Sequence, residues 1–449
     1  MQVSLIVLAA GMGTRMNSDL PKVLHKLAAV PMLHHALAAG RALEPSRIVV
    51  VTGHGAEEVA KAALDFDEAV QTVVQDPQLG TGHAVAQAAP LLAEAEGEAI
   101  VLYGDTPLVR AETLQAMLEA RARHAVVILG FEAKDPARYG RLIVAGDQLL
   151  KIVEYKDASE TERAITLCNS GVVCAEAATL FRLVAKIGTQ NASNEYYLTD
   201  IVEIAQAEGL SVGYVTCPES ETLGINTRAQ LAEAEAAFQT RARFDALENG
   251  VTLTAPDTVF FALDTWIGRD AVVGPHVIFG PAVTVESGAE IKGFCHLEGC
   301  HISRGAQVGP FARLRPGAEL AEDVHVGNFV EIKNSVLDEG VKVGHLTYLG
   351  DAHVGEFTNI GAGTVTCNYD GVMKHRTEIG KNAFIGSSTM LVAPVSVGDG
   401  ALTASGSVIT QDVPAEALAL ARAKQINKPG LATKLFDRLK AIKAAKGKA

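Results

Sequence analysis

The sequence predicts a chain of two folds, an α/β domain with a mainly parallel sheet followed by a parallel β-helix. Three observations carry this prediction. Short apolar runs alternate with helical patterns over residues 1–225, the segment 227–248 lacks glycine and proline, and beyond about residue 255 apolar residues recur every six positions. Alternating strands and helices are typical of a parallel sheet covered by helices on both faces. A six-residue period is neither helical nor simple alternation, and it indicates a hexapeptide β-helix.

The first half contains strand-like apolar runs separated by helix-like stretches. The runs are Val3–Leu8, Arg47–Val51, Val70–Val74, Ala99–Tyr103 and Ala125–Leu129, and the stretches between them include 56–64 and 111–122. Ligands of such sheets bind outside the carboxyl ends of the strands. The glycine-rich loop that follows the first run and the triplet Tyr103-Gly104-Asp105 therefore lie on the edge where we expect a site.

A long helix is expected between the two halves. Residues 227–248 are rich in Ala, Glu and Arg, which favour helix. Asn249-Gly250 is a suitable end for this helix, because both residues tolerate a left-handed backbone. We therefore expect an α/β domain over 1–226, a linker helix over 227–250 and a β-helical domain over 251–449.

The six-residue period defines the interior of the second half. Each rung of such a helix has three short strands, and one aliphatic residue per strand points inward. The residues expected inside are Ile267, Val273, Phe279, Val285, Ile291, Leu297, Ile302, Val308, Leu314, Leu320, Val326, Ile332, Leu337, Val343, Leu349, Ile379, Ile385, Leu391 and Val397. A loop that opens at Thr366–Gly371 interrupts the period until Ile379, and inserted loops are frequent binding sites.

Composition narrows the classes of partner and compartment. A chain of 449 residues has room for two or three cores, and its net charge of −13 disfavours nucleic acid. No apolar run reaches the length of a membrane span, so we expect no membrane insertion. The six cysteines are scattered without a C-x-x-C pair, which favours reduced thiols and a cytoplasmic protein. Spacing alone leaves a catalytic cysteine open, although most unpaired cysteines are small buried hydrophobes.

The loop LAAGMGTRMNSDLPK, from Leu8 to Lys22, is suited to a phosphate chain. Its glycines allow close approach of backbone N–H groups, and Arg15 and Lys22 add positive charge. The dinucleotide fingerprint is excluded because Met16 stands in place of its third glycine, and the P-loop is excluded because no Gly-Lys-Ser/Thr triplet ends the loop. The remaining pattern, L-A-A-G-x-G-T-R-M with a downstream P-K, resembles the sugar-1-phosphate nucleotidyltransferase family.

Nucleotidyl transfer needs a divalent cation and positive charge on the leaving pyrophosphate. Asp105 is a hard oxygen ligand of the kind that Mg²⁺ prefers, with a turn aspartate before Thr106-Pro107 as the alternative. Gln75 and the turn Leu79–Ala84 can read a uracil edge by hydrogen bonds.

Further segments extend the resemblance over nearly the whole chain, in order. They are 139–141, 152–156, 169–171, 224–226, 313–317, 328–333, 344–351, 359–363 and 366–371. Together they resemble the family of bifunctional N-acetylglucosamine-1-phosphate uridyltransferases and glucosamine-1-phosphate N-acetyltransferases. That resemblance implies a Rossmann-like nucleotidyltransferase domain and a left-handed β-helix. The β-helix acyltransferases that it resembles are typically trimers, so it also implies a homotrimer.

The resemblance assigns roles in the first half. It places the uridine on Leu8, Ala9, Ala10, Gly11, Gln75, Gly80 and Thr81. It makes Arg15 and Lys22 the catalytic, phosphate-binding cations, and Asp105 and Asn226 the ligands of Mg²⁺. It places the sugar and ribose near Tyr103, Gly104, Gly140, Glu154 and Asn169.

The resemblance also assigns the second site. Histidine can accept a proton from an attacking amine near neutral pH, but with 13 histidines the composition selects none. By the family pattern, His345 is the general base. The sugar phosphate is assigned to Arg315 and Lys333, and the sugar to Tyr348 and Asn359. The acetyl-CoA site is assigned to Ala362, Asn368, Tyr369, Ser387, Ser405 and Arg422, with Ser405 standing where the family often has alanine.

The implied function is synthesis of UDP-N-acetylglucosamine from glucosamine-1-phosphate, with acetyl-CoA and UTP as co-substrates and Mg²⁺ as cofactor. Two alternatives stay open, a nucleotidyltransferase whose β-helix is only a regulatory or trimerising module, and a nucleotide-sugar sensor. The basic stretch from Lys424 to Ala449 has apolar residues at helical spacing. It predicts a tail helix or a solvated tail, with a membrane-surface helix as the sharper alternative.

Overall fold

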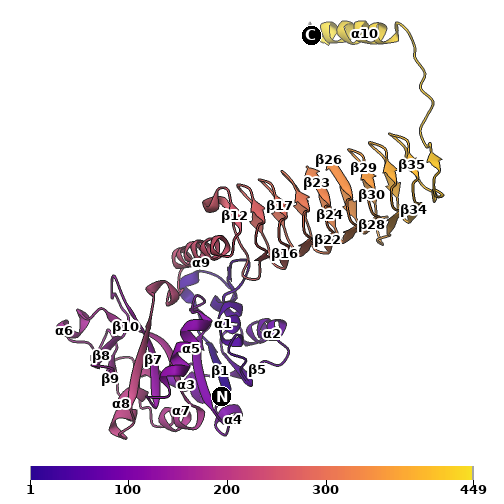
Figure 1. Cartoon of the computed structure of the whole chain (residues 1–449). Coiled ribbons are helices and arrows are strands. Elements are labelled where there is room, and N and C mark those ends of the chain that lie inside the picture. Colours follow the sequence, from indigo (N-terminus) through magenta and orange to yellow (C-terminus); the bar gives the residue numbers. More distant parts are fainter. Residues whose placement is uncertain (1, 447–449) are drawn as a thin grey trace. The chain divides into compact units, whose positions relative to one another are not determined.

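The computed structural model describes residues 2–446 and divides them into two compact units (Figure 1). One unit comprises the chain up to Trp266 together with Ile278–Val283, and the other comprises Ile267–Val277 and the chain from Thr284 onward. Within the described residues, no helix is both long and apolar enough to cross a membrane.

The N-terminal unit is built on a nine-stranded sheet with the order β5-β4-β1-β6-β10-β7-β11-β9-β8. Its strands are β1 (Val3–Ala9), β4 (Arg47–Thr52), β5 (Gln71–Val74), β6 (Glu98–Tyr103), β7 (Val126–Glu132), β8 (Arg141–Ala145), β9 (Gln148–Val153), β10 (Leu167–Glu176) and β11 (Val212–Cys217). β1 pairs in parallel with β4 and β6, whereas β10 pairs antiparallel with β6 and β7. The sheet is therefore mixed, with a parallel part that carries the glycine-rich loop.

Both faces of this sheet are covered, as the continuous apolar run of β1 predicts. All of β1 is buried, with Leu5 and Val7 in one apolar cluster and Ile6 and Leu8 in another. This alternation follows from the period of two along a strand. The helices of the unit are α1 (Met32–Arg41), α2 (Ala56–Phe66), α3 (Thr81–Ala86), α4 (Ala89–Leu92), α5 (Ala111–Ala120), α6 (Glu160–Arg163), α7 (Ala177–Val184), α8 (Ile201–Ala207) and α9 (Arg228–Glu248).

Two short 3₁₀ turns and a hairpin follow β1. They are η1 (Thr14–Met16), η2 (Lys22–Leu24) and the hairpin of β2 (Lys26–Leu27) with β3 (Val30–Pro31). The long helix α9 begins where the sequence predicts, because the Thr227 hydroxyl caps it by accepting a hydrogen bond of 3.2 Å from the Gln230 N–H.

The C-terminal unit is a prism of three parallel sheets whose rungs follow one another in Figure 1. From β14 onward the first sheet contains β14 (Val272–Val273), β17 (Glu290–Ile291), β20 (Gln307–Val308), β23 (His325–Asn328), β26 (Lys342–His345), β29 (Asn359–Ile360), β32 (Phe384–Ile385), β35 (Leu402–Thr403) and β37 (Leu418–Ala419). The second contains β18 (His296–Leu297), β21 (Arg313–Leu314), β24 (Glu331–Lys333), β27 (Tyr348–Gly350), β30 (Val365–Cys367), β33 (Met390–Val392) and β36 (Val408–Ile409). The third contains β19 (Cys300–Ile302), β22 (Ala318–Leu320), β25 (Ser335–Leu337), β28 (Ala352–Val354), β31 (Thr377–Ile379) and β34 (Val395–Val397).

The predicted interior of the prism is observed at every position but one. The other apolar residues expected inside are buried, Phe279 included, whereas Ile267 is only half-buried. Ile267 lies on β13 (Trp266–Ile267), which is the end strand of its sheet and therefore has a neighbouring strand on one side only. The interruption of the repeat is also observed, as a loop between β30 and β31.

The tail forms α10 (Leu431–Lys446), which matches the predicted helical spacing. Its apolar residues Leu431, Leu435, Leu439 and Ile442 are all exposed.

Candidate active sites

A cavity of about 390 Å³ lies at the carboxyl ends of the parallel strands in the N-terminal unit. The predicted uridine residues Leu8, Ala9, Ala10, Gly11, Gln75, Gly80 and Thr81 all line it, together with Lys22, Tyr103 and Asp105. They come from the end of β1 and the loop after it, the segment after β5, the start of α3, and the end of β6 with the residues that follow. The strand order therefore gathers segments that are far apart in the sequence around one opening.

The ammonium of Lys22 lies between the two predicted magnesium ligands. It forms an ion pair with Asp105 and donates a hydrogen bond of 3.0 Å to Asn226 Oδ1. Gly13 permits this placement, because its φ is +62° and a Cβ there would lie 2.6 Å from Lys22 Cβ. The glycine-rich loop thus lies directly against the stem of Lys22.

The oxygens of Asp105 and Asn226 suit a hard divalent cation, because they already converge on one positive charge. Among the residues that the structure describes, no group of three or more His, Cys, Asp or Glu side chains could hold a metal. Two protein oxygens fit Mg²⁺ well, since it usually keeps several waters and binds through one or two carboxylates plus substrate phosphates.

A second cavity of about 510 Å³ adjoins the first and shares Thr81, Tyr103 and Glu195 with it. Glu154 and Asn169, which we expect near the sugar, line this cavity. Burial raises the pKa of the Tyr103 phenol, and burial likewise raises the pKa of the Glu154 carboxyl. Tyr103 is therefore a neutral hydrogen-bonding group throughout the physiological range.

Four predicted residues of this half do not line either cavity. Arg15 is exposed on η1, close in sequence to the lining residues Gly11 and Met12. Asn226 reaches the first cavity only through Lys22. Gly104 and Gly140 contact residues that line the cavities through their backbone groups.

Those backbone contacts are specific. The Gly104 N–H donates to the Leu8 carbonyl at 2.9 Å. The Gly140 carbonyl accepts from the Asn169 N–H at 2.8 Å.

In the C-terminal unit, several predicted residues form one column along the corner that follows the first sheet. The strand register pairs Lys342 with Asn359, Asn359 with Phe384, and Phe384 with Leu402. The residues three positions further along each strand therefore occupy equivalent places in successive rungs. They are His345, Ala362, Ser387 and Ser405. With strands about 4.8 Å apart, the column from His345 to Ser405 spans about 14 Å.

His345 is held in one tautomer by Asn328, its partner in the preceding rung. The distance between His345 Nδ1 and Asn328 Oδ1 is 2.7 Å. Because an amide oxygen can only accept, Nδ1 carries the hydrogen and Nε2 keeps a lone pair. No residue in 2–446 forms a hydrogen bond with this Nε2, and the side chain is exposed. His345 can therefore accept a proton from a substrate.

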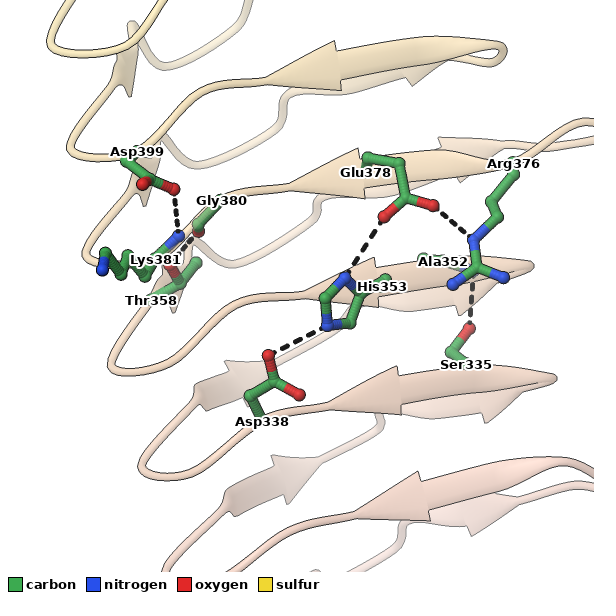
Figure 2. Close-up of polar contacts among 10 residues, drawn as sticks. All are labelled: Ser335, Asp338, Ala352, His353, Thr358, Arg376, Glu378, Gly380, Lys381 and Asp399. Carbon is green, nitrogen blue, oxygen red and sulfur yellow. Dashed lines mark hydrogen bonds and ion pairs between the residues drawn. The ribbon is translucent and has the colours of Figure 1, made fainter.

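His353, on the third sheet, differs from His345 because it has two partners. Figure 2 shows His353 between two carboxylates, at 2.9 Å from Asp338 and 3.2 Å from Glu378. Arg376 forms an ion pair of 2.5 Å with the other oxygen of Glu378. Both ring nitrogens of His353 thus have a carboxylate partner. These polar contacts connect three successive rungs on the face of the third sheet.

The expected sugar-phosphate residues belong to the second sheet, with Lys333 on β24 and Arg315 directly after β21. Arg315 donates to Glu331 at 2.8 Å, and Glu331 pairs with Tyr348 in the next rung. Lys374, from the inserted loop, approaches Lys333 and lowers its pKa. Arg315 adds further positive charge, and the carboxylate of Asp351 is the anion that partly offsets it. This excess of cations suits a phosphate beside Lys333.

The inserted loop is anchored near this group. The Asn368 amide donates to Asp351. Burial alone would raise the pKa of Asp351, but hydrogen bonds from Asn334 and Asn368 and the charges of two lysines outweigh it and lower that pKa. Tyr369 remains exposed in the loop, with its hydroxyl bonded to the Gly371 carbonyl at 2.6 Å.

Arg422 and Ser405 lie together, because the guanidinium donates to the Ser405 carbonyl at 2.7 Å. The departure from alanine at Ser405 thus leaves this backbone contact intact. Asn359 lies on β29, one rung beyond His345.

The cysteines are poor nucleophiles. All six are free thiols, and burial raises the pKa of each one, Cys367 included. A thiol with a raised pKa has little thiolate at neutral pH.

Sequence reasoning missed several residues of both sites. Asn328 and Glu331 were within reach, since each lies one 17-residue rung before His345 and Tyr348. Lys374 lies outside the repeat and had no such signal. Gln78, Glu195 and Tyr197 line the cavities and were not singled out.

Comparisons with known proteins agree with this architecture. Residues 5–173 match the MobA-like NTP transferase domain, and residues 376–411 match the bacterial transferase hexapeptide of six repeats. A bifunctional protein GlmU from Cereibacter sphaeroides is 75% identical over 446 residues, which cover 99% of this chain and 98% of that protein. Those of Paracoccus denitrificans and a Ruegeria species are 68% and 66% identical, covering 98% and 100% of both chains. The chain therefore belongs to the GlmU family of bifunctional enzymes, which confirms the predicted pairing of a nucleotidyltransferase domain with a left-handed hexapeptide β-helix acetyltransferase.

Proposed function

We propose that the C-terminal unit acetylates glucosamine-1-phosphate and that the N-terminal unit joins the product to uridine phosphate, which yields UDP-N-acetylglucosamine. The observation that carries this proposal is His345, whose Nδ1 is fixed by Asn328 and whose Nε2 is open to a substrate amine. A β-helix that served only for assembly or regulation would not need a histidine with one nitrogen fixed and the other open to a substrate. We propose that the activities divide at the segment 227–250.

In the acetylation, the amine nitrogen of glucosamine-1-phosphate attacks the thioester carbonyl of acetyl-CoA. The new C–N bond forms, the C–S bond breaks, and His345 Nε2 takes the proton that the nitrogen loses. The thiolate of CoA leaves and is then protonated. Arg315, Lys333 and Lys374 balance the phosphate of the sugar, while the column Ala362, Ser387 and Ser405 follows the extended arm of CoA from the base toward Arg422.

In the uridylyl transfer, a phosphate oxygen of N-acetylglucosamine-1-phosphate attacks the α-phosphorus of UTP. The bond to the β-phosphate breaks and pyrophosphate leaves. We propose that Lys22 and Arg15 bind the triphosphate and offset the charge on the leaving group. Asp105 and Asn226 would hold Mg²⁺, which supplies further neutralisation of phosphate charge when bound. Glu154 and Asn169 would position the sugar in the second cavity.

We propose that the functional enzyme is a homotrimer that works in the cytoplasm, where UTP and acetyl-CoA are made and free thiols persist. The family pattern of the hexapeptide β-helix supports the trimer. Light scattering of the full chain tests it, with the mass of three chains as the expected result and the mass of one chain as the refuting result.

Two assays on the same preparation test the function. Release of free CoA thiol from acetyl-CoA should require glucosamine-1-phosphate, and release of pyrophosphate from UTP should require N-acetylglucosamine-1-phosphate. The absence of thiol release, with pyrophosphate release intact, would favour the alternative in which the β-helix is only an assembly or regulatory module. The absence of both would favour a sensor.

A further inference from the structure

The side chain of Gln75 is buried against the nucleotide cavity, and its amide nitrogen lies beside two polar partners. Only 3% of this residue is exposed, and it lines the cavity of about 390 Å³. Its Nε2 donates to the Gly80 carbonyl at 2.9 Å and lies 3.1 Å from His83 Nδ1. No residue in 2–446 donates to its Oε1. The amide therefore presents a single acceptor to whatever base enters.

The Gly80 carbonyl is a rigid partner in this arrangement. Gly80 has a φ of +113°, and a Cβ there would lie 2.6 Å from the Tyr196 carbonyl oxygen. If Gln75 were turned by half a rotation, its oxygen would face this carbonyl at hydrogen-bond distance with little water to separate them. Gly80 thus supplies one of two contacts that set the direction of the amide.

His83 supplies the second contact, provided that Nδ1 accepts. The other nitrogen, Nε2, lies 3.1 Å from the side-chain amide of Gln87. A neutral imidazole has one donor and one acceptor nitrogen, so only one glutamine can donate to it. Gln87 Nε2 also donates to the His83 carbonyl at 3.0 Å, so turning this amide gives up that bond. Gln87 is half-exposed, however, and water can solvate both its NH₂ and the His83 carbonyl when its oxygen faces Nε2–H. Gln75 is buried and has no such freedom, so Nδ1 is the acceptor.

We propose that His83 is a specificity-determining positioning residue that selects the base by fixing the direction of the Gln75 amide. This inference rests on the proposed uridylyl transfer. Uracil carries a hydrogen on N3 and can donate to Gln75 Oε1. Cytosine has a lone pair on N3, which would face that oxygen. A buried group left unpaired in this way costs far more than an absent contact.

The test compares UTP with CTP in the full-length enzyme and a matched pair of variants. His83→Asn places an amide oxygen near the position of Nδ1. His83→Leu is the matched variant, because leucine has nearly the shape of asparagine but no hydrogen-bond acceptor. The measurement is kcat/KM for each nucleotide, from pyrophosphate release with N-acetylglucosamine-1-phosphate as acceptor. We expect His83→Leu to lower the ratio of the UTP value to the CTP value about fivefold, which is the contribution of one hydrogen bond, and His83→Asn to restore it to within about twofold.

Gln87→Met is the control on the other side of the ring. It removes the contact to Nε2 and should leave the ratio within about twofold of the wild type. If His83→Leu unfolds, as thermal scanning would show, His83→Phe replaces it, because Phe keeps a ring beside Tyr196 without any nitrogen.

The outcomes separate the inference from the proposed function. Equal loss with both nucleotides in His83→Leu and its Phe substitute would overturn the role in base selection and leave a structural role. So would a change in Gln87→Met as large as that in His83→Leu. A wild-type enzyme that releases no pyrophosphate from UTP would instead refute the proposed uridylyl transfer, whatever the variants do.

Discussion

Asn328 offers a direct test of how the acetyl-transfer base is prepared. Its side chain contacts His345 through one hydrogen bond of 2.7 Å between Asn328 Oδ1 and Nδ1. Asn328→Ala removes that acceptor. A single hydrogen bond contributes about 1 kcal/mol, so the population of correctly oriented rings should fall about fivefold. Water can reach the exposed ring and replace part of the contact, which keeps the loss small.

Removal of the base itself should cost far more. General-base catalysis is worth about 10²–10⁴-fold, so His345→Ala should lower kcat for acetylation by that factor. The loss in His345→Ala should therefore be much larger than the loss in Asn328→Ala, because the two residues have different roles. In this proposal Asn328 orients the base, and His345 accepts the proton.

Asn328→Asp changes the charge state of the pair rather than its geometry. A carboxylate 2.7 Å from Nδ1 would stabilise the imidazolium, which cannot accept a proton. The acidic limb of the pH–rate profile for CoA release should therefore move to higher pH, with the rate recovering in alkaline buffer. Pyrophosphate release in the same preparation is the internal control and should not change. An acidic limb that stays in place would refute the reasoning.

Three further predictions follow from single groups. Asp105→Ala should abolish pyrophosphate release and spare CoA release; activity close to the wild type in excess Mg²⁺ would contradict its place on the metal. Cys367→Ala should retain acetylation, and mass spectrometry with acetyl-CoA alone should show no acetyl adduct; an adduct consumed by glucosamine-1-phosphate would overturn direct transfer. Burial and the neighbouring acid Glu203 raise the pKa of Asp200 from 3.8 to about 6. Its charge therefore destabilises the folded state as pH rises through 6, and Asp200→Asn should add about 1 kcal/mol to the free energy of unfolding at pH 8 and almost nothing at pH 4.

The repeat made the C-terminal unit predictable to the level of single residues. One aliphatic side chain per strand was enough to locate the interior, because every rung buries its residues in the same way. The same regularity places His345 and Ser405 in one column, since residues at equal distances from paired positions share a corner. The exception is Ile267, which lies on the end strand of its sheet. The six-residue period predicts an inward side chain there, but it does not predict whether a further strand covers that side chain.

The remaining parts of the sites had no periodic signal. Lys374 reaches Lys333 from a loop outside the repeat, and Asn226 reaches the cavity only through Lys22. His83 was visible in its motif, but its function depends on which ring nitrogen faces Gln75. Contacts of this kind depend on how two segments meet, and local sequence encodes that only indirectly.

The contacts of the long helix α9 could not be predicted from its composition either. Its composition predicts a helix and suggests a spacer, yet polar side chains along it anchor the segment that carries Lys22. Arg228 lies 3.1 Å from His25 Nδ1, and Glu235 accepts from the Ala28 N–H at 2.7 Å. Because α9 begins two residues after Asn226, these contacts hold the predicted magnesium ligand and the phosphate-binding lysine in one frame. We therefore expect the first turns of α9 to support the proposed nucleotidyltransferase site, a role that a spacer helix predicted from composition does not include.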